Sequence, residues 1–200
     1  FVARNPDFIT LGAAVVERVI QKGYTDVNAE LSGMVDDLAV KIREKMGLKR
    51  VKVVSAGPND YLTSYIHGDG AIGVVVKLSS DKAISDERVK TFAFDLALHI
   101  AAFNPLALDR SRIDSAHIAE QEAIYRKQIE ADEKMKGKPA NVVDNILKGK
   151  VNKYLADICL VDQGFVKDEK VNVAKAIEDL GKQVGAKLAI ADYVYFRVGQ

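Results

Sequence analysis

The sequence predicts an α+β fold, in which small antiparallel sheets are covered on one face by helices and a helical hairpin projects as an arm. Three observations carry this prediction. Two strand-like runs meet at the turn signal Asp69-Gly70, helical periodicity surrounds them on both sides, and Lys136-Gly137-Lys138-Pro139 separates two charge-rich helical stretches. Helices that are segregated from the strands in this way are typical of α+β architecture.

A β-hairpin over Tyr61–Ser79 is the element around which the other elements are arranged. Asp-Gly provides the positive backbone φ angles that a two-residue type I′ turn requires. In the resulting register His67 faces Ile72 and lies at the rim beside the turn. One face of the hairpin is apolar and has to be covered; it carries Tyr61, Tyr65, Ile72, Val74, Val76 and Leu78.

The same stretch contains a G-x-G-x-x-G pattern, formed by Gly68, Gly70 and Gly73. This pattern binds a dinucleotide only where its glycines open a helix, whose N-terminal N–H groups hold the pyrophosphate. Here the last glycine leads into Val74–Val76, and β-branched residues favour a strand. We therefore interpret the pattern as a hairpin turn. The alternative, a nucleotide-dependent enzyme, requires a helix after Gly73.

Composition argues against several classes of protein. The 200 residues are 48% apolar and 28% charged, and their net charge of +1 gives no overall attraction to nucleic acid or to an anionic membrane. A single cysteine rules out an internal disulfide framework, and no apolar run approaches the ~20 residues that span a bilayer. We expect no direct contact with nucleic acid and none with a membrane. Because the first residue is Phe1 and not Met, we expect the chain to start inside a longer protein.

Two helices and an extended stretch precede the hairpin. The first helix is capped at Asn5 or Asp7 and stops at Gly23. A second helix is expected over about Asn28–Met46, and Leu48–Ala56 is then extended, with apolar and polar residues in alternation.

A strongly periodic helix over about Asp86–Phe103 follows the hairpin and is expected to cover its apolar face. Its aligned apolar residues are Val89, Phe92, Leu96, Ile100 and Phe103. Asn104-Pro105 ends it, because the residue before a proline avoids the helical region. His99 lies at the edge of the apolar stripe. We interpret it as a packed, hydrogen-bonded core histidine, because no second type of metal ligand lies at helical spacing from it.

Ser115–Met135 and Ala140–Val161 form the two helices of the predicted arm. Each carries many charges and only a narrow apolar seam, as in a short antiparallel coiled coil. Such an arm either contacts a partner or is a solvated helix pair with no contact role. Cys159, at the end of the second helix, is expected to be a small buried hydrophobe.

The remaining residues return to the sheet. Gln163–Asp168 is expected to be a loop that exposes Phe165 and Val166, a helix follows the Asn172 cap, and Ala186–Val198 is a strand that joins the sheet of the hairpin. The chain is thereby divided into three parts: an incomplete N-terminal core subdomain, residues 1–57; a C-terminal core subdomain, residues 58–110 and 164–200; and the arm inserted into it, residues 111–163.

No residue pattern indicates catalysis, a cofactor or a metal. His67, His99 and His117 belong to three different elements, and the sequence has no metal-binding spacing, no Walker loop and no G-x-S-x-G elbow. Carboxylates are paired with bases along exposed helices, as Glu130 is with Lys134. We therefore expect no catalytic residue, no cofactor and no metal site, and a protein that acts through its contact surfaces.

Six stretches, in the same order, resemble motifs of the elongation factor Ts family, whose members promote guanine-nucleotide exchange on elongation factor Tu. They span essentially the whole chain: Phe1–Asn5, Lys45–Gly47, Tyr65–Val74, Leu96–Ala102 with Pro105, Lys136–Pro139 and Gln163–Val166. The chain departs from the family pattern at Leu48-Lys49, where the family has Glu-Asn, and at the turn residue Asp69. The family's N-terminal helical module and first strand pair have no counterpart in the sequence, so we expect a fragment or a missing companion piece.

The resemblance implies which residues bind the partner: Phe1, Val2, Met46, Gly47, His67, Phe165, Val166 and Lys167. Phe1 would insert as a wedge near the magnesium and phosphate site of elongation factor Tu, and His67 would help to hold the same region. Residues 165–167 would touch another domain of the partner. The arm would brace against the partner or against a second copy, which leaves a homodimer and a 2:2 assembly open. The resemblance also implies a bacterial cytoplasmic protein, with an organellar version as the alternative.

Two functions without covalent chemistry remain to be compared. The first is an exchange factor that acts by binding elongation factor Tu. The second is an adaptor or structural protein that binds its partners through the charged arm. Removal of Ser115–Val161 distinguishes them, because an adaptor of this kind would lose all partner binding and an exchange factor only part of it.

Overall fold

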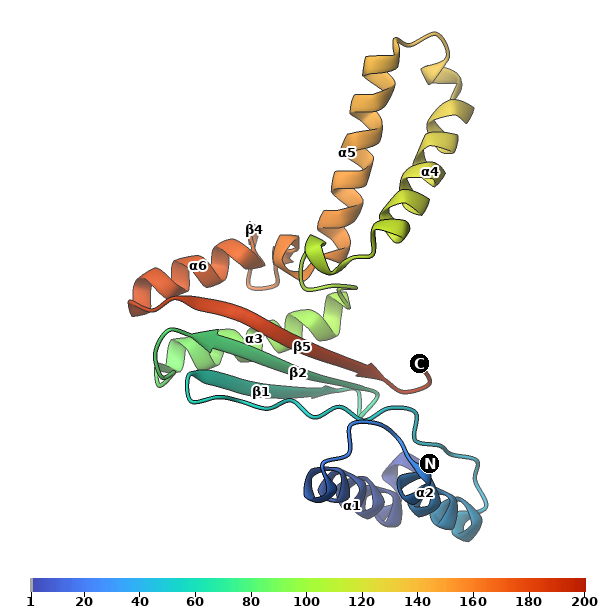
Figure 1. Ribbon diagram of the computed structural model, residues 1–200, viewed down its shortest axis with the longest axis vertical. Coiled ribbons are helices and arrows are strands. Elements are labelled where there is room, and N and C mark those ends of the chain that lie inside the picture. Colours follow the sequence, from blue (N-terminus) through green and yellow to red (C-terminus); the bar gives the residue numbers. More distant parts are fainter. Residues whose placement is uncertain (1) are drawn as a thin grey trace.

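The computed structural model describes residues 2–200, and their fold confirms the predicted α+β class (Figure 1). A three-stranded antiparallel sheet with the order β1-β2-β5 lies at the centre. Its strands are β1 (Asp60–His67), β2 (Ile72–Ser80) and β5 (Leu188–Arg197). The C-terminal strand therefore joins the hairpin's sheet, as predicted.

The hairpin has the predicted register and turn. Tyr61 pairs with Leu78, Tyr65 with Val74 and His67 with Ile72. Asp69 and Gly70 have φ angles of 53° and 91°, as a type I′ turn requires. The G-x-G-x-x-G pattern leads into β2 and not into a helix, so the alternative of a dinucleotide-binding loop is wrong.

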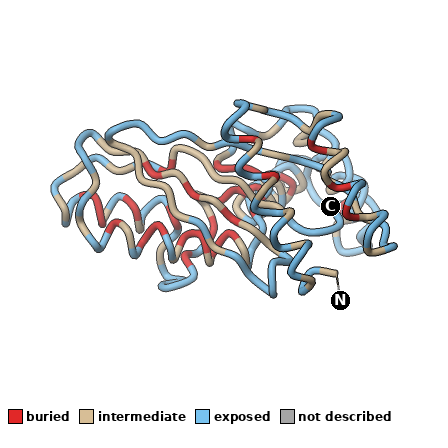
Figure 2. The backbone as a smooth tube through the Cα atoms, turned by 90° about the horizontal axis from the view of Figure 1, so that it is seen from below, coloured by how far each residue is buried: buried red, intermediate tan, exposed pale blue. Residues whose placement is uncertain are grey.

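Helix α3 (Glu87–Phe103) covers the apolar face of the sheet and forms the main core with it. Along β2, buried residues alternate with half-buried ones, and α3 carries a buried stripe (Figure 2). Leu78, Leu96 and Ile100 are fully buried between sheet and helix. The prediction failed at one end of the helical stripe: Phe103 is 51% exposed, and its ring stacks on His99 with the ring centroids 4.6 Å apart.

Two helices precede the sheet and pack around a second, smaller cluster, with Leu31 fully buried at its centre. Helix α1 (Pro6–Lys22), after the short 3-10 helix η1 (Val2–Arg4), has the predicted caps: the Asn5 side chain accepts from the Asp7 N–H, and Gly23 is left-handed. Both helices lie on the side of the sheet opposite to the arm (Figure 1).

Helix α2 (Ala29–Ile42) ends before the predicted Met46, because Arg43 adopts a left-handed conformation with φ 59° and terminates it. The chain that follows carries Leu48 and Val51 onto the cluster of α1 and α2, which explains the early end. Within the described residues, the segment 48–56 pairs with no strand.

The arm is an antiparallel helical hairpin that projects from the body (Figure 1). It consists of α4 (Ser115–Ala131), η3 (Glu133–Met135) and α5 (Ala140–Ile158), and η2 (Arg110–Arg112) and η4 (Leu160–Asp162) flank its base. The first predicted helix therefore extended four residues beyond the end of α4, and the second extended three residues beyond the end of α5. Ile129 and Leu147 are buried in the narrow seam, and Cys159 is fully buried at the base, as predicted.

The segment after the arm differs from the predicted exposed loop. Gly164–Phe165 forms β3 and pairs with β4 (Asp168–Asn172) in a separate two-stranded sheet. Phe165 is only 7% exposed, because its ring packs on Phe92 of α3. Helix α6 (Val173–Val184) then begins at the predicted Asn172 cap and ends at Gly185. In residues 2–200, no helix has both the length and the apolar character needed to cross a bilayer.

Tyr193 of β5 gives the fold a pH dependence at high pH. Its hydroxyl donates a hydrogen bond to the Pro105 carbonyl oxygen over 2.7 Å, and burial raises the pKa of Tyr193 to about 12. A raised pKa in the folded state means that the contribution to stability is complete below pH ~10, the ordinary tyrosine pKa, and is lost as the pH rises through about 12. We expect the free energy of unfolding of the wild type to approach that of Tyr193→Phe across this window, measured by denaturant titration. A constant difference between the two proteins from pH 9 to pH 12 would contradict this expectation.

Candidate partner-binding surface

The N-terminal segment and the tip of the hairpin meet at one end of the molecule. Arg4 donates to Asp69, with 2.9 Å between Nη2 and Oδ2, although 65 residues separate them in the chain. Both side chains are about four-fifths exposed, so the ion pair adds little stability by itself. The ion pair shows instead that η1, which contains Val2, lies close to the hairpin turn that follows His67. Phe1, the predicted wedge, lies outside the described residues.

His67 is exposed at the rim of the hairpin, as predicted, and its ring is held by a neighbour. The Tyr65 hydroxyl and His67 Nδ1 are 2.9 Å apart, and the Tyr65 ring meets Phe94 of α3 edge-on with the centroids 5.8 Å apart. This anchoring was not predicted from the sequence. The signal was available, because residues i and i+2 of a strand lie on the same face.

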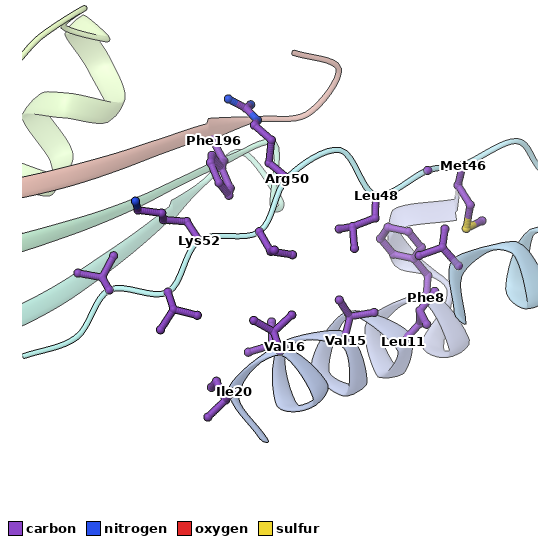
Figure 3. A pocket seen from close by; sticks show the side chains of 17 residues that line it. Phe8, Leu11, Val15, Val16, Ile20, Met46, Leu48, Arg50, Lys52 and Phe196 are labelled. Carbon is purple, nitrogen blue, oxygen red and sulfur yellow. The ribbon is translucent and has the colours of Figure 1, made fainter. Parts of the chain in front are cut away.

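Met46 and Gly47 lie beside α1, on the wall of an apolar groove of about 480 Å³ (Figure 3). Side chains of α1, including Val16 and Ile20, face the extended segment that follows Met46 across this groove, and Phe196 of β5 closes one side of it. Arg50 lies over the Phe196 ring, 4.6 Å from its centroid.

A second groove, of about 1150 Å³, adjoins the first, since Phe8 and Gly12 of α1 line both. It runs between the start of α1 and the hairpin tip, from Asn5 to Gly70. The two grooves therefore connect the chain neighbours of Val2 and His67 with Met46 and Gly47. The His67 side chain itself lies on the other face of the sheet, beside Tyr65.

The same end of the molecule exposes an unusual number of large apolar side chains: Ile9, Val16, Ile20, Ile66 and Val198. Ile66 and Phe196 both pair with Gly73 across the sheet, so they share the sheet face that α3 does not cover. Gathered apolar side chains of this kind are typical of surfaces that bind another protein. Two apolar stripes on α1, one buried and one exposed, were the signal in the sequence that could have revealed this surface.

Phe165, Val166 and Lys167 do not belong to this end. Phe165 is the last residue of β3, and Val166 and Lys167 form the turn into β4, which lies on the same side of the sheet as the arm (Figure 1). The predicted exposure of Phe165 is wrong, because α3 covers its ring. Val166 is partly exposed, and Lys167 forms an ion pair with Asp95 of α3, with 3.1 Å between Nζ and Oδ1. The eight predicted residues thus fall, as far as they are described, into two separate groups.

The side chains on these surfaces are suited to contact with a partner. Among residues 2–200, no group of three or more His, Cys, Asp or Glu side chains is placed to hold a metal ion. In the described part of the chain, Tyr65 is the one side-chain hydrogen-bond partner of His67, and burial raises the pKa of the Cys159 thiol, which disfavours a nucleophilic thiolate.

Comparison with known proteins gives one consistent result. The family described as "Elongation factor TS" matches residues 1–200. Elongation factor Ts of Treponema denticola is 41% identical over 201 residues, which cover 100% of this chain and 70% of the relative. Elongation factor Ts of Borrelia recurrentis is 38% identical over 202 residues, and that of Borreliella burgdorferi 33%, with 100% of this chain and 71% of each relative covered. From the order of its motifs, its fold and these similarities, the chain belongs to the elongation factor Ts family of translation elongation factors.

Proposed function

We propose that this chain promotes the release of GDP from elongation factor Tu during translation elongation, in the cytoplasm of a bacterium, by binding and without covalent chemistry. The observation that carries the proposal is a pair of adjoining apolar grooves at one end of the molecule: Met46 and Gly47 line the first, and the chain neighbours of Val2 and His67 line the second. We assign this end to the nucleotide domain of elongation factor Tu, because the resemblance to the family implies that Phe1 and His67 meet that domain.

Thermodynamic linkage explains how binding alone releases a nucleotide. A factor that binds the empty partner more tightly than the GDP-bound partner lowers the affinity for GDP by the same ratio. Disturbing the magnesium site is an effective way to do so, because Mg²⁺ requires near-ideal octahedral geometry. The energy would come from burial of exposed apolar side chains such as Ile66, each of which contributes about 1.5–3 kcal/mol when fully buried.

The turn between β3 and β4 would provide a second contact, with a different domain of elongation factor Tu. Because the Phe165 ring is buried against α3, we assign this contact to Val166 and Lys167 and give Phe165 the role of supporting them from below. Two separate contacts on one chain would fix the orientation of the partner as well as its affinity.

A pull-down experiment tests the proposal. The chain is immobilised and offered nucleotide-free elongation factor Tu, with and without an excess of GDP. We expect retention in the absence of GDP and release in its presence. Equal retention under both conditions, or none under either, would contradict an exchange function.

Shortening of the arm separates this function from that of an adaptor. His117 Nε2 and the Tyr154 hydroxyl form a hydrogen bond of 2.7 Å that joins the two helices near the base of the arm. Replacing residues 119–152 by a short Gly-Ser linker removes the outer arm and leaves this pair in place. We expect a partial loss of affinity for elongation factor Tu in the same pull-down, because the grooves and the β3–β4 turn are untouched. A complete loss of binding by a folded variant would favour the adaptor.

A further inference from the structure

One buried titratable side chain has no part in the function proposed above. His99 of α3 is fully buried, and both of its ring nitrogens have partners. The backbone N–H of Val166 donates to Nδ1 over 3.2 Å, and Nε2 lies 2.9 Å from Gln163 Oε1. Since a backbone N–H can only donate, Nδ1 is the acceptor and Nε2 carries the proton that is donated to Gln163. The ring is therefore neutral, in agreement with the burial that lowers the pKa of His99.

Gln163 extends this hydrogen bonding to the arm. Its Nε2 donates to the carbonyl oxygen of Asp157, in the last turn of α5, over 2.7 Å. The backbone carbonyl oxygen of Gln163 accepts a hydrogen bond from the backbone N–H of Val173, the first residue of α6. A continuous path of hydrogen bonds thus runs from the N–H of Val166 through His99 and Gln163 to the base of the arm. We call these three bonds the Val166–Asp157 relay.

Helix α3 holds the same turn at two further points. Asp95, one helical turn before His99, pairs with Lys167, and Phe92 packs on the Phe165 ring with the centroids 5.2 Å apart. Each residue of the turn 165–167 therefore has its own support from one face of α3. Such a close set of supports is more than a short surface turn needs for its own folding, and it is what a contact surface of fixed geometry requires.

We propose that His99 and Gln163 are positioning residues, which hold the turn 165–167 in a fixed orientation relative to the arm so that both can engage the protein partner together. This role rests on the proposed exchange function and refines it. His99 and Gln163 touch no partner; they act through the backbone of Val166 and through the end of α5. Any buried histidine needs hydrogen-bond partners, but here both partners belong to the segment that carries the turn, since they are Val166 and Gln163.

The variants are chosen to remove the relay in parts. His99→Leu removes both hydrogen bonds of the ring and keeps a similar apolar volume. His99→Asn places a side-chain oxygen near the position of Nδ1, so that Val166 keeps an acceptor. Gln163→Met removes the link to Asp157 and leaves the bond from Val166 to the histidine intact. Gln183→Met is the matched control for Gln163→Met, because Gln183 is exposed near the C-terminal end of α6, outside the relay, the turn and the arm.

Two measurements on these variants test the proposal. The first is the acceleration of GDP release from elongation factor Tu as a function of the concentration of the chain. We expect His99→Leu and Gln163→Met to raise the half-saturating concentration about two- to tenfold, the effect of one net buried hydrogen bond, with an unchanged maximal rate. The second is hydrogen exchange of the Val166 amide, which we expect to be faster in His99→Leu and close to the wild type in His99→Asn.

The outcomes separate this role from the function on which it rests. Unchanged half-saturation in folded variants of an active protein would overturn the positioning role alone, as would an equal effect of Gln183→Met. No acceleration of GDP release by the unchanged chain would overturn the proposed function and this role with it. Gln163→Met carries the test if His99→Leu does not fold, because Gln163 lies at the edge of the core.

Discussion

Replacement of His67 by alanine is expected to slow the release of GDP from elongation factor Tu by about tenfold or more at subsaturating concentrations of the chain. His67 is exposed at the hairpin rim with its ring held by the Tyr65 hydroxyl, so it meets a partner without first losing rotational freedom. Preorganised aromatic side chains of this kind account for a large share of binding energy in protein interfaces, about 2 kcal/mol or more each. Stopped-flow displacement of a fluorescent GDP analogue measures the rate.

Two further substitutions make this prediction specific. Tyr65→Phe removes only the hydroxyl that orients His67, and we expect a smaller decrease in rate than for His67→Ala. Gln183→Ala, at an exposed position of α6, is expected to leave the rate close to that of the wild type. A wild-type rate for His67→Ala, in a protein with an unchanged melting temperature, would remove His67 from the contact surface.

The substitution Gly181→Ala is expected to destabilise the protein by about 1–3 kcal/mol. A Cβ atom at this position of α6 would lie 2.8 Å from the carbonyl oxygen of Ala186, a backbone atom that cannot move without shifting the start of β5. This cost exceeds the ~0.5–1 kcal/mol that alanine ordinarily gains over glycine in a helix. Denaturant titration measures the difference in the free energy of unfolding.

Gly149→Ala is the matched control, because Gly149 is exposed in α5 and a Cβ there meets no atom within 4 Å. We expect this variant to be more stable than the wild type by about 0.5–1 kcal/mol. The two glycine substitutions therefore have opposite signs although both lie in helices. If both variants gained stability, the close approach of α6 to the chain before β5 would not exist in solution.

The contact surface was only partly predictable from the sequence. The position of His67 at the rim follows from the Asp69-Gly70 turn and from the period of two, which are local properties of the chain. Its proximity to the N-terminal segment is a tertiary arrangement, seen in the ion pair of Arg4 with Asp69, and no local pattern predicts a contact between residues 65 positions apart. The exposure of apolar residues on the outer stripe of α1 likewise depends on which other elements happen to cover that helix.

The sequence by itself determined the α+β class, the hairpin register, most helix starts and the family of the protein. Caps, turns and hydrophobic periodicity act over a few residues, and each of them restricts the backbone strongly enough to be recognised without a tertiary contact. Only the tertiary structure decided where α2 ends, that Phe103 is exposed and that Phe165 is buried. These outcomes depend on competition between distant surfaces: Phe165 is covered because Phe92 and His99 of α3 lie above it, and burying an aromatic ring outweighs the weak local preference of Gln163–Asp168 for an open loop.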